Sequence, residues 1–166
     1  DRRTADRLAG KWEGDAMLRR EGVIDPRTDR HAANDARTLA DHLDDWEAAL
    51  KAKGNTLRGV AMVKARAARV IALAGATRIS ELSPSAVLGA IKAVRDGDAD
   101  HPAASLQTCH HYVRAIKGFS RWLNRDGRTP ADALAHLSGF NAATDRRYER
   151  RAFDGDELAR LIDAAV

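Results

Sequence analysis

The spacing of apolar residues is helical wherever a period can be recognised, and no segment alternates apolar and polar residues as a half-buried strand does. The pattern predicts helices over 2–21, 35–53, 57–75, 84–95 and 105–127, and a last amphipathic segment after Asp154. The predicted fold class is therefore all-α: a small bundle of four to five helices with an extra N-terminal helix and a truncated C-terminal helix.

Helix boundaries follow from capping residues. Ser83-Pro84 is typical of an N-cap followed by the first helical position, and Ser105 is a second N-cap. Gly54 and Gly75 are suited to end the helices before them. Between the helices we expect a linker at 22–29, a loop at 96–104, a short helical turn at 131–137 and an aperiodic segment at 138–151.

The buried faces are predicted from the same period. In the second helix they comprise Leu39, Leu43, Trp46 and Leu50. In the third they comprise Val60, Val63, Ala67, Val70, Ile71 and Ala74. In the fifth they comprise Leu106, Cys109, Val113, Ile116, Ser120 and Leu123, with Tyr112 and Phe119 at one margin.

Four regions are expected along the chain. Residues 1–30 form an N-terminal helix and linker that end a preceding module. Residues 31–138 form a helical domain, 139–151 a basic interdomain linker, and 152–166 the first helix of a truncated further domain.

Composition limits the possible classes of protein. With 166 residues the chain suits one ordinary domain, and its single cysteine excludes an internal disulfide and fits a reducing cytoplasm. No apolar run approaches the roughly 18 residues that span a membrane. The net charge of +4 favours a polyanionic partner, so we expect a cytoplasmic, nucleoid-associated protein without a membrane or small-molecule ligand.

The placement of charge sharpens this expectation. Acidic residues gather on the second helix, whereas the polar faces of the third and fifth helices carry cations without acids until Asp126. Long flexible cations on such faces suit phosphate contacts. On the third helix they are Arg58, Lys64, Arg66 and Arg69, with Lys64 at the edge of the core. On the fifth they are Arg114, Lys117, Arg121 and Arg125, in one stripe with the titratable His110.

Further residues complete the predicted interface with double-stranded DNA. Gln107, Thr108 and His111 lie near the start of the fifth helix, where they and His110 are candidates for base-edge contacts. The linker adds Arg146, Arg147, Arg150 and Arg151, which we expect to lie along the same polyanion. A solvated polar surface is the alternative interpretation, since most soluble helices have a polar face.

Other chemistry is not indicated. The histidines lack zinc-ligand spacing, His110 and His111 are adjacent and point about 100° apart, and Cys109 falls on an apolar face. Without predicted strands there is no context for a glycine-rich phosphate loop. We therefore predict no catalytic residues, no metal and no cofactor.

From Ser105 onward the sequence resembles the tyrosine recombinase (phage integrase) family. The shared pattern is T-x-x-x-Y-x-x-x-I-K-x-F-x-x-W-L, here Thr108, Tyr112, Ile116, Lys117, Phe119, Trp122 and Leu123. RRAFDGDELARLI is similar to the start of that family's catalytic domain, and TRISELSPSAVLGAI to a connecting segment upstream. The turn GRTPADALAHL departs from the family's usual N-P before the leucine. The resemblance covers roughly 35–166.

This resemblance implies a core-binding (SAM-like) domain, a small helical bundle that grips DNA beside the strand-exchange site. It also implies that the family's catalytic Arg, Lys, His and Tyr nucleophile belong to the domain that begins near Ala152, so neither Tyr112 nor Tyr148 is assigned that role. Self-association on DNA would then be a property of the full-length protein.

Two alternatives remain at this stage. The chain could be a helical protein-interaction module whose basic faces are merely solvated. A self-sufficient nuclease or recombinase is disfavoured, because no set of catalytic residues is present.

Overall fold

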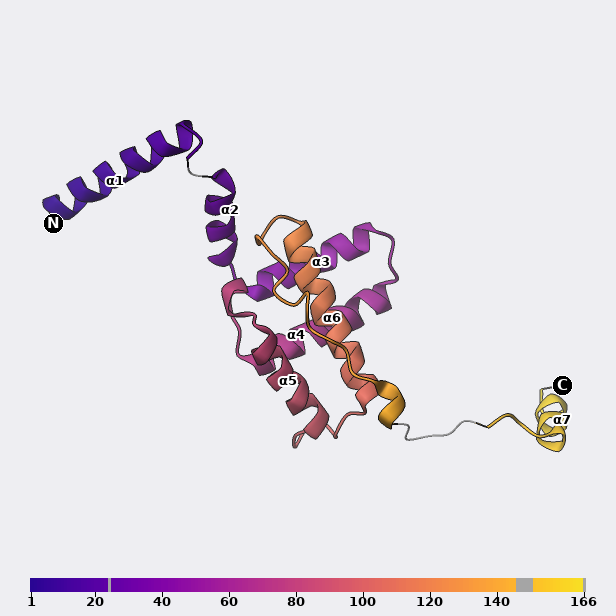
Figure 1. Ribbon diagram of the computed structural model, residues 1–166. Coiled ribbons are helices and arrows are strands. Elements are labelled where there is room, and N and C mark those ends of the chain that lie inside the picture. Colours follow the sequence, from indigo (N-terminus) through magenta and orange to yellow (C-terminus); the bar gives the residue numbers. More distant parts are fainter. Residues whose placement is uncertain (24, 146–150, 166) are drawn as a thin grey trace.

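The chain folds as an all-α structure in which four helices form a bundle and the terminal helices project from it (Figure 1). The computed structural model describes residues 1–23, 25–145 and 151–165. No strand occurs within these ranges, and the predicted all-α class is confirmed. The elements are α1 (Arg2–Arg20), α2 (Pro26–Asp35), α3 (Leu39–Ala52), α4 (Leu57–Ala74), η1 (Ile79–Glu81), α5 (Pro84–Asp96), α6 (Leu106–Arg125), η2 (Ala142–Asp145) and α7 (Gly155–Asp163).

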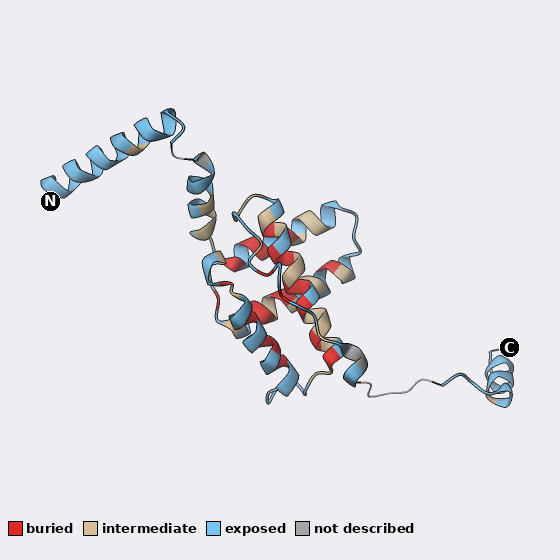
Figure 2. Ribbon diagram, in the orientation of Figure 1, coloured by how far each residue is buried: buried red, intermediate tan, exposed pale blue. Residues whose placement is uncertain are grey.

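Burial is concentrated in α3 to α6 and in the turns that close them, whereas α1 and α7 contain no buried residue (Figure 2). Trp12 on α1 is 67% exposed. The bundle therefore has one hydrophobic core, and the projecting helices contribute nothing to it.

Side-chain caps set most helix starts where the sequence predicts them. Ser83 and Ser105 accept hydrogen bonds from the backbone N–H groups of Ala86 and Thr108, three residues on (both 3.2 Å). Gly75 ends α4 in the left-handed conformation, with φ +67°, which a residue with a side chain rarely adopts.

The predicted linker at 22–29 is wrong from Pro26 onward. Asp25 accepts a hydrogen bond from the Arg27 N–H (2.9 Å) and Pro26 opens α2, so the Asp-Pro pair is a helix start and not part of a linker. The helix expected over 35–53 begins at Leu39, because Thr38 and Asp41 form a capping box there.

The segment after α6 also differs from expectation. Residues 131–137 form successive turns closed by Ala135 N–H to Asp132 O and Leu137 N–H to Leu134 O bonds (3.2 and 3.1 Å) instead of a continuous helical turn. Within the predicted linker, the Asp145 carboxylate accepts the N–H of Leu106 at the start of α6 (2.8 Å). The bundle therefore extends beyond residue 138.

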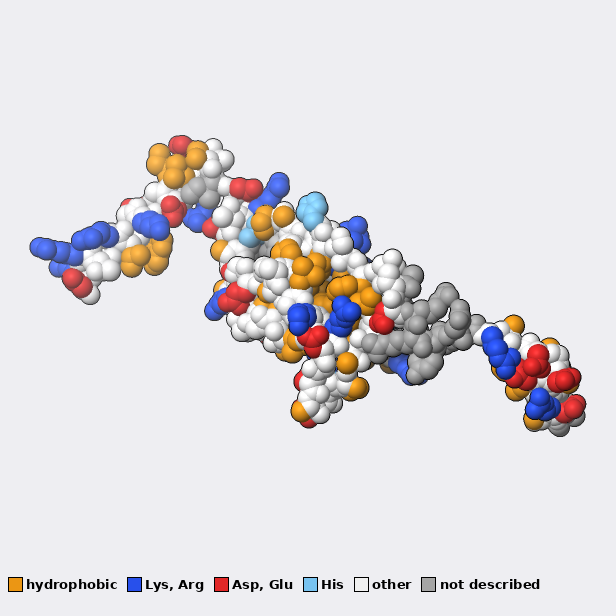
Figure 3. Space-filling model, turned by 60° about the horizontal axis from the view of Figure 1, so that its bottom comes forward, with side chains coloured by type: hydrophobic (Ala, Val, Ile, Leu, Met, Phe, Trp, Pro, Cys, Tyr) orange, Lys and Arg blue, Asp and Glu red, His pale blue; other side chains and the backbone are white. Residues whose placement is uncertain are grey.

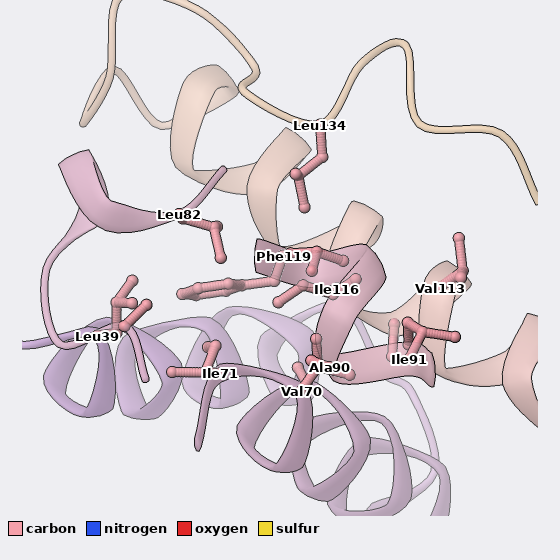
Figure 4. Packing of buried hydrophobic residues seen from close by; sticks show 14 of the residues in the cluster. Leu39, Val70, Ile71, Leu82, Ala90, Ile91, Val113, Ile116, Phe119 and Leu134 are labelled. Atoms are coloured by element: carbon pink, nitrogen blue, oxygen red, sulfur yellow. The ribbon is translucent and has the colours of Figure 1, made fainter. Parts of the chain in front are cut away.

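The core is built around Phe119, which was expected at a margin of α6 and is instead fully buried. Its ring lies between Leu82 on one side and Leu39 and Ile71 on the other (Figure 4). It also contacts Trp46 at a centroid distance of 5.4 Å. Burial of an aromatic side chain of this size contributes about 3 kcal/mol, so Phe119 is a principal reason for the way α6 lies across α3 and α4.

Arg128 fastens the chain after α6 to α3. Its guanidinium donates to the Asp45 carboxylate (2.6 Å) and to Asp126 (2.8 Å), and lies 4.4 Å from the centre of the Trp122 ring. Its side chain is only 14% exposed. Such partly buried, multiply bonded contacts are stronger than surface ion pairs.

His42 completes this contact as a neutral imidazole. Its Nε2–H donates to the Asn34 carbonyl (3.0 Å), so Nδ1 is left to accept from Arg128 (2.7 Å). Burial lowers the pKa of His42, and the facing charge of Arg128 lowers it further.

We predict that Arg128→Met lowers the free energy of unfolding by about 1–3 kcal/mol, because Asp45 and His42 each lose a charged partner. Urea denaturation at pH 7 measures this. Arg95→Met on the exposed side of α5 is the control, expected within about 0.5 kcal/mol of wild type. Equal stability of the two variants would contradict the account of Arg128.

The lowered pKa of His42 predicts that stability depends on pH. As the pH falls below about 6.5, the unfolded chain takes up a proton at this position before the folded chain does, so stability decreases as the pH falls. We expect the free energy of unfolding, measured between pH 7.5 and 5, to decrease less steeply in His42→Asn. An unchanged slope would show that His42 is not held neutral.

Candidate nucleic-acid interface

Helix α6 presents opposite surfaces to the core and to solvent. Leu106, Cys109, Val113, Ile116, Ser120 and Leu123 are buried as predicted, together with Ala115 and Phe119. The remaining arc carries the polar residues Gln107, His110, His111, Arg114, Lys117, Arg121 and Arg125. We call this arc the α6 polar surface.

Three arginines of the α6 polar surface extend into solvent. Arg114, Arg121 and Arg125 are exposed, and none of them forms an ion pair within the part of the chain that the structure describes. No acidic residue lies on α6. Their charges are therefore available to a polyanion without displacing a carboxylate.

Helix α4 brings a further cation to this surface. The pKa of His111 is lowered, first by burial and then by the positive charges of Arg66, His110 and Arg114. Arg66 belongs to α4, which packs against α6, so the two predicted basic helices meet here. The Gln107 amide donates to Nε2 of His111 (3.4 Å), which fits a neutral imidazole.

The other predicted cations of α4 lie elsewhere. Arg58 is exposed at the start of the helix. Arg69 is half-buried and lies 3.5 Å from the Asp98 carboxylate in the loop after α5.

Lys64 is turned away from the α6 polar surface and toward α3. Its ammonium donates to Asp44 (2.5 Å) and Glu47 (2.6 Å), and these carboxylates raise its pKa. Glu47 is held by Lys51 as well, and the two ammonium groups lower the pKa of Glu47 to about 2. Lys64 thus neutralises the acidic helix and is not presented with the arginines.

A groove of about 380 Å³ runs beside the exposed cations. One wall is the polar surface of α6 and the other is the segment around Gly139, which packs back against the helix. The residues that line it include His110, Arg114, Lys117, Gly118, Arg121 and Gly139.

Lys117 holds the second wall of the groove in place. Its ammonium donates to the carbonyl oxygens of Ala135 (3.1 Å) and Leu137, the last carbonyls of the turns that follow α6. One of its three N–H donors remains for another partner. The sequence predicts Lys117 as a DNA contact; its position also gives it this structural role.

The two glycines of the groove have different explanations. A Cβ on Gly139 would lie 2.8 Å from the His110 ring, so only glycine permits this wall to pack so closely. Nδ1 of His110 is buried beneath it and has no hydrogen-bond partner among the described residues. A Cβ on Gly118 would meet only Cζ2 of Trp46, at an ordinary 3.6 Å.

Of the predicted base-contacting residues, Gln107 is the most accessible. It is exposed, whereas Thr108 is half-buried and its hydroxyl lies 3.0 Å from Ser105 Oγ. His110 and His111 are also half-buried, on opposite edges of the α6 polar surface.

The predicted basic linker falls largely outside the described residues, which exclude Arg146, Arg147 and Arg150. Arg151 is described and pairs with Glu157 at the start of α7 through two contacts (2.7 and 2.5 Å). The charge of Arg151 is therefore paired with a carboxylate of the neighbouring helix α7.

The groove and its second wall were missed by sequence reasoning. Periodicity identifies the polar face of α6, but it gives no information on which loop folds back over that face. The small and apolar residues of SGF at 138–140 were the available signal, since Phe140 packs against the core.

Charged side chains of both signs are mixed on the projecting helices, as Figure 3 shows for α7. The described residues contain no group of three or more His, Cys, Asp or Glu side chains placed to hold a metal ion. None of the described helices has both the length and the hydrophobicity needed to cross a lipid bilayer.

No protein-family model, curated protein or solved structure matches this chain.

The proximity of α4 and α6 can be tested through His111. We predict that Arg66→Met raises the pKa of His111, because one of the charges that disfavours its protonation is lost, while burial continues to hold the value below the usual one. NMR titration of the imidazole C2–H measures this. Arg95→Met, on α5, is the control; the same pKa in all three proteins would contradict the placement of the Arg66 charge near His111.

Proposed function

We propose that this chain binds double-stranded DNA through the α6 polar surface and the adjoining part of α4. The observation that carries the proposal is the separation of charge. Arg114, Arg121 and Arg125 are exposed without acidic partners among the described residues, while three of the four acids of α3 pair with cations of the bundle itself, as Asp44 does with Lys64.

This separation suits a phosphate backbone. Each guanidinium that meets a phosphate releases condensed counterions, so binding by several arginines is strong at low salt and weakens steeply as salt rises. Under this proposal Arg66, Arg114, Arg121 and Arg125 contact phosphates, and the remaining N–H donor of Lys117 contacts a fifth. Gln107, at the exposed start of α6, is the first candidate for a base edge.

We propose further that the bundle is the core-binding domain of a tyrosine recombinase. The support is the sequence pattern on α6 and the place of its residues in the structure. Ile116, Phe119 and Leu123 are buried in the core. Lys117 donates hydrogen bonds to the turns that follow α6. The pattern therefore coincides with residues that stabilise the bundle. Under this proposal α7 belongs to the catalytic domain, and no reaction is proposed for this chain itself.

A second candidate, a module for protein contacts, is favoured by the exposed apolar residues Leu158, Leu161 and Ile162 on α7. It predicts DNA affinity no greater than that of another protein with the same net charge. Self-association through α7 would belong to this candidate and is compatible with the first.

The test is fluorescence anisotropy of a labelled duplex of about 30 base pairs, titrated at several salt concentrations. We expect the logarithm of the binding constant to fall with the logarithm of salt with a slope of about −4 to −5, for about five neutralised phosphates. Arg114→Ala and Arg121→Ala should each weaken binding to all sequences and reduce the magnitude of the slope by about 1.

The matched control is Arg95→Ala, which removes an exposed arginine from α5 and should leave affinity and slope unchanged. If all three variants lose affinity equally, net charge and not the α6 polar surface is responsible. If the wild-type protein shows no salt-dependent binding, the proposal is wrong.

A further inference from the structure

Gly118 lies in the middle of α6, where glycine is a costly choice. Glycine loses more backbone freedom on helix formation than alanine does, so an interior glycine destabilises a helix unless packing or function requires it. Packing makes no such demand here, because an added Cβ would make one ordinary contact with Trp46 at 3.6 Å.

The surroundings of Gly118 indicate a role for the absence of a side chain at this position. It lies in the groove beside α6, four residues after Arg114 and three residues before Arg121. These spacings place all three residues on one side of the helix, with the glycine between the two guanidiniums along the axis. A side chain at 118 would occupy the space toward which both arginines can turn.

The groove is large enough for an anion of the DNA backbone. Its volume is about 380 Å³, and a water molecule occupies about 30 Å³, so a phosphate fits together with several waters. Arg114 and Arg121 line the groove on either side of the glycine. Lys117 lines it as well, with its ammonium bonded to the carbonyls of Ala135 and Leu137.

We propose that Gly118 is a contact point for one phosphodiester group of DNA, which lies directly on the α6 backbone between Arg114 and Arg121. This inference rests on the proposed DNA binding and adds a defined position for one phosphate of the DNA. A guanidinium on each side supplies charge-assisted hydrogen bonds to phosphate oxygens, and the missing side chain allows the close approach that those bonds need.

The experiment compares Gly118→Ala with Gly89→Ala by the same anisotropy titration. Gly89 is an interior glycine of α5, exposed, with no atom within 4 Å of an added Cβ. Both variants gain helix propensity, so thermal unfolding followed by circular dichroism should show a Tm equal to or above that of wild type. Only Gly118→Ala should weaken DNA binding, by about tenfold, the effect of losing one charge-assisted hydrogen bond.

Two outcomes overturn the inference while leaving the proposed function intact. One is that Gly118→Ala binds DNA with wild-type affinity although Arg114→Ala, measured under the same conditions, binds it more weakly. The other is a lowered Tm of Gly118→Ala, which would show that the fold itself requires this glycine. If neither the wild-type protein nor any variant binds DNA, the proposed function fails, and the inference fails with it.

Discussion

The burial of one side of α6 is the constraint on which the rest of this structure depends. Phe119 sits at the centre of the core, and with Ile116 and Leu123 it commits the apolar side of the helix to α3, α4 and α5. Once one side of the helix is fixed against the core, the orientation of its other side is fixed as well. The polar residues of α6 must face solvent or the loop that follows, and their spacing then determines a line of cations.

The same packing decides which charges remain available. Lys64 pairs with two acids of α3 and Arg128 with a third, so these two cations serve the fold. Arg114 and Arg121 form no ion pair with those acids and stay exposed. The separation of a structural from an accessible set of cations is thus a consequence of helix packing, and net charge alone would not reveal it.

Much of the fold could be predicted from the sequence, because local signals agreed with one another. The apolar period and the caps at Ser83 and Ser105 placed α4 to α6 almost to the residue. The Asp25-Pro26 start of α2 was misinterpreted as part of a linker, although it carries the same N-cap and proline signal as Ser83-Pro84. Phe119 was placed at a margin because periodicity does not show how many neighbours surround a helix.

The candidate site was predictable only as a face of a helix. The polar arc of α6 follows from the period, but the groove depends on Gly139 and on the turns held by Lys117. These contacts join residues far apart in the sequence, Lys117 to Leu137 and Gly139 to His110, and no local pattern encodes them. The same holds for Lys64, because no local pattern indicates its ion pairs with Asp44 and Glu47 on α3.

The central claim is that the α6 polar surface, with the adjoining part of α4, is where DNA binds. The most direct test is to add an unlabelled duplex to ¹⁵N-labelled protein and follow the backbone amide resonances by NMR. The account predicts that the shifts that change gather at Arg66, Gln107, Arg114, Gly118 and Arg121, while the solvent-exposed side of α5 and the acidic positions of α3 remain unchanged. Changes confined to α1, α5 or α7, with α6 unaffected, would contradict it.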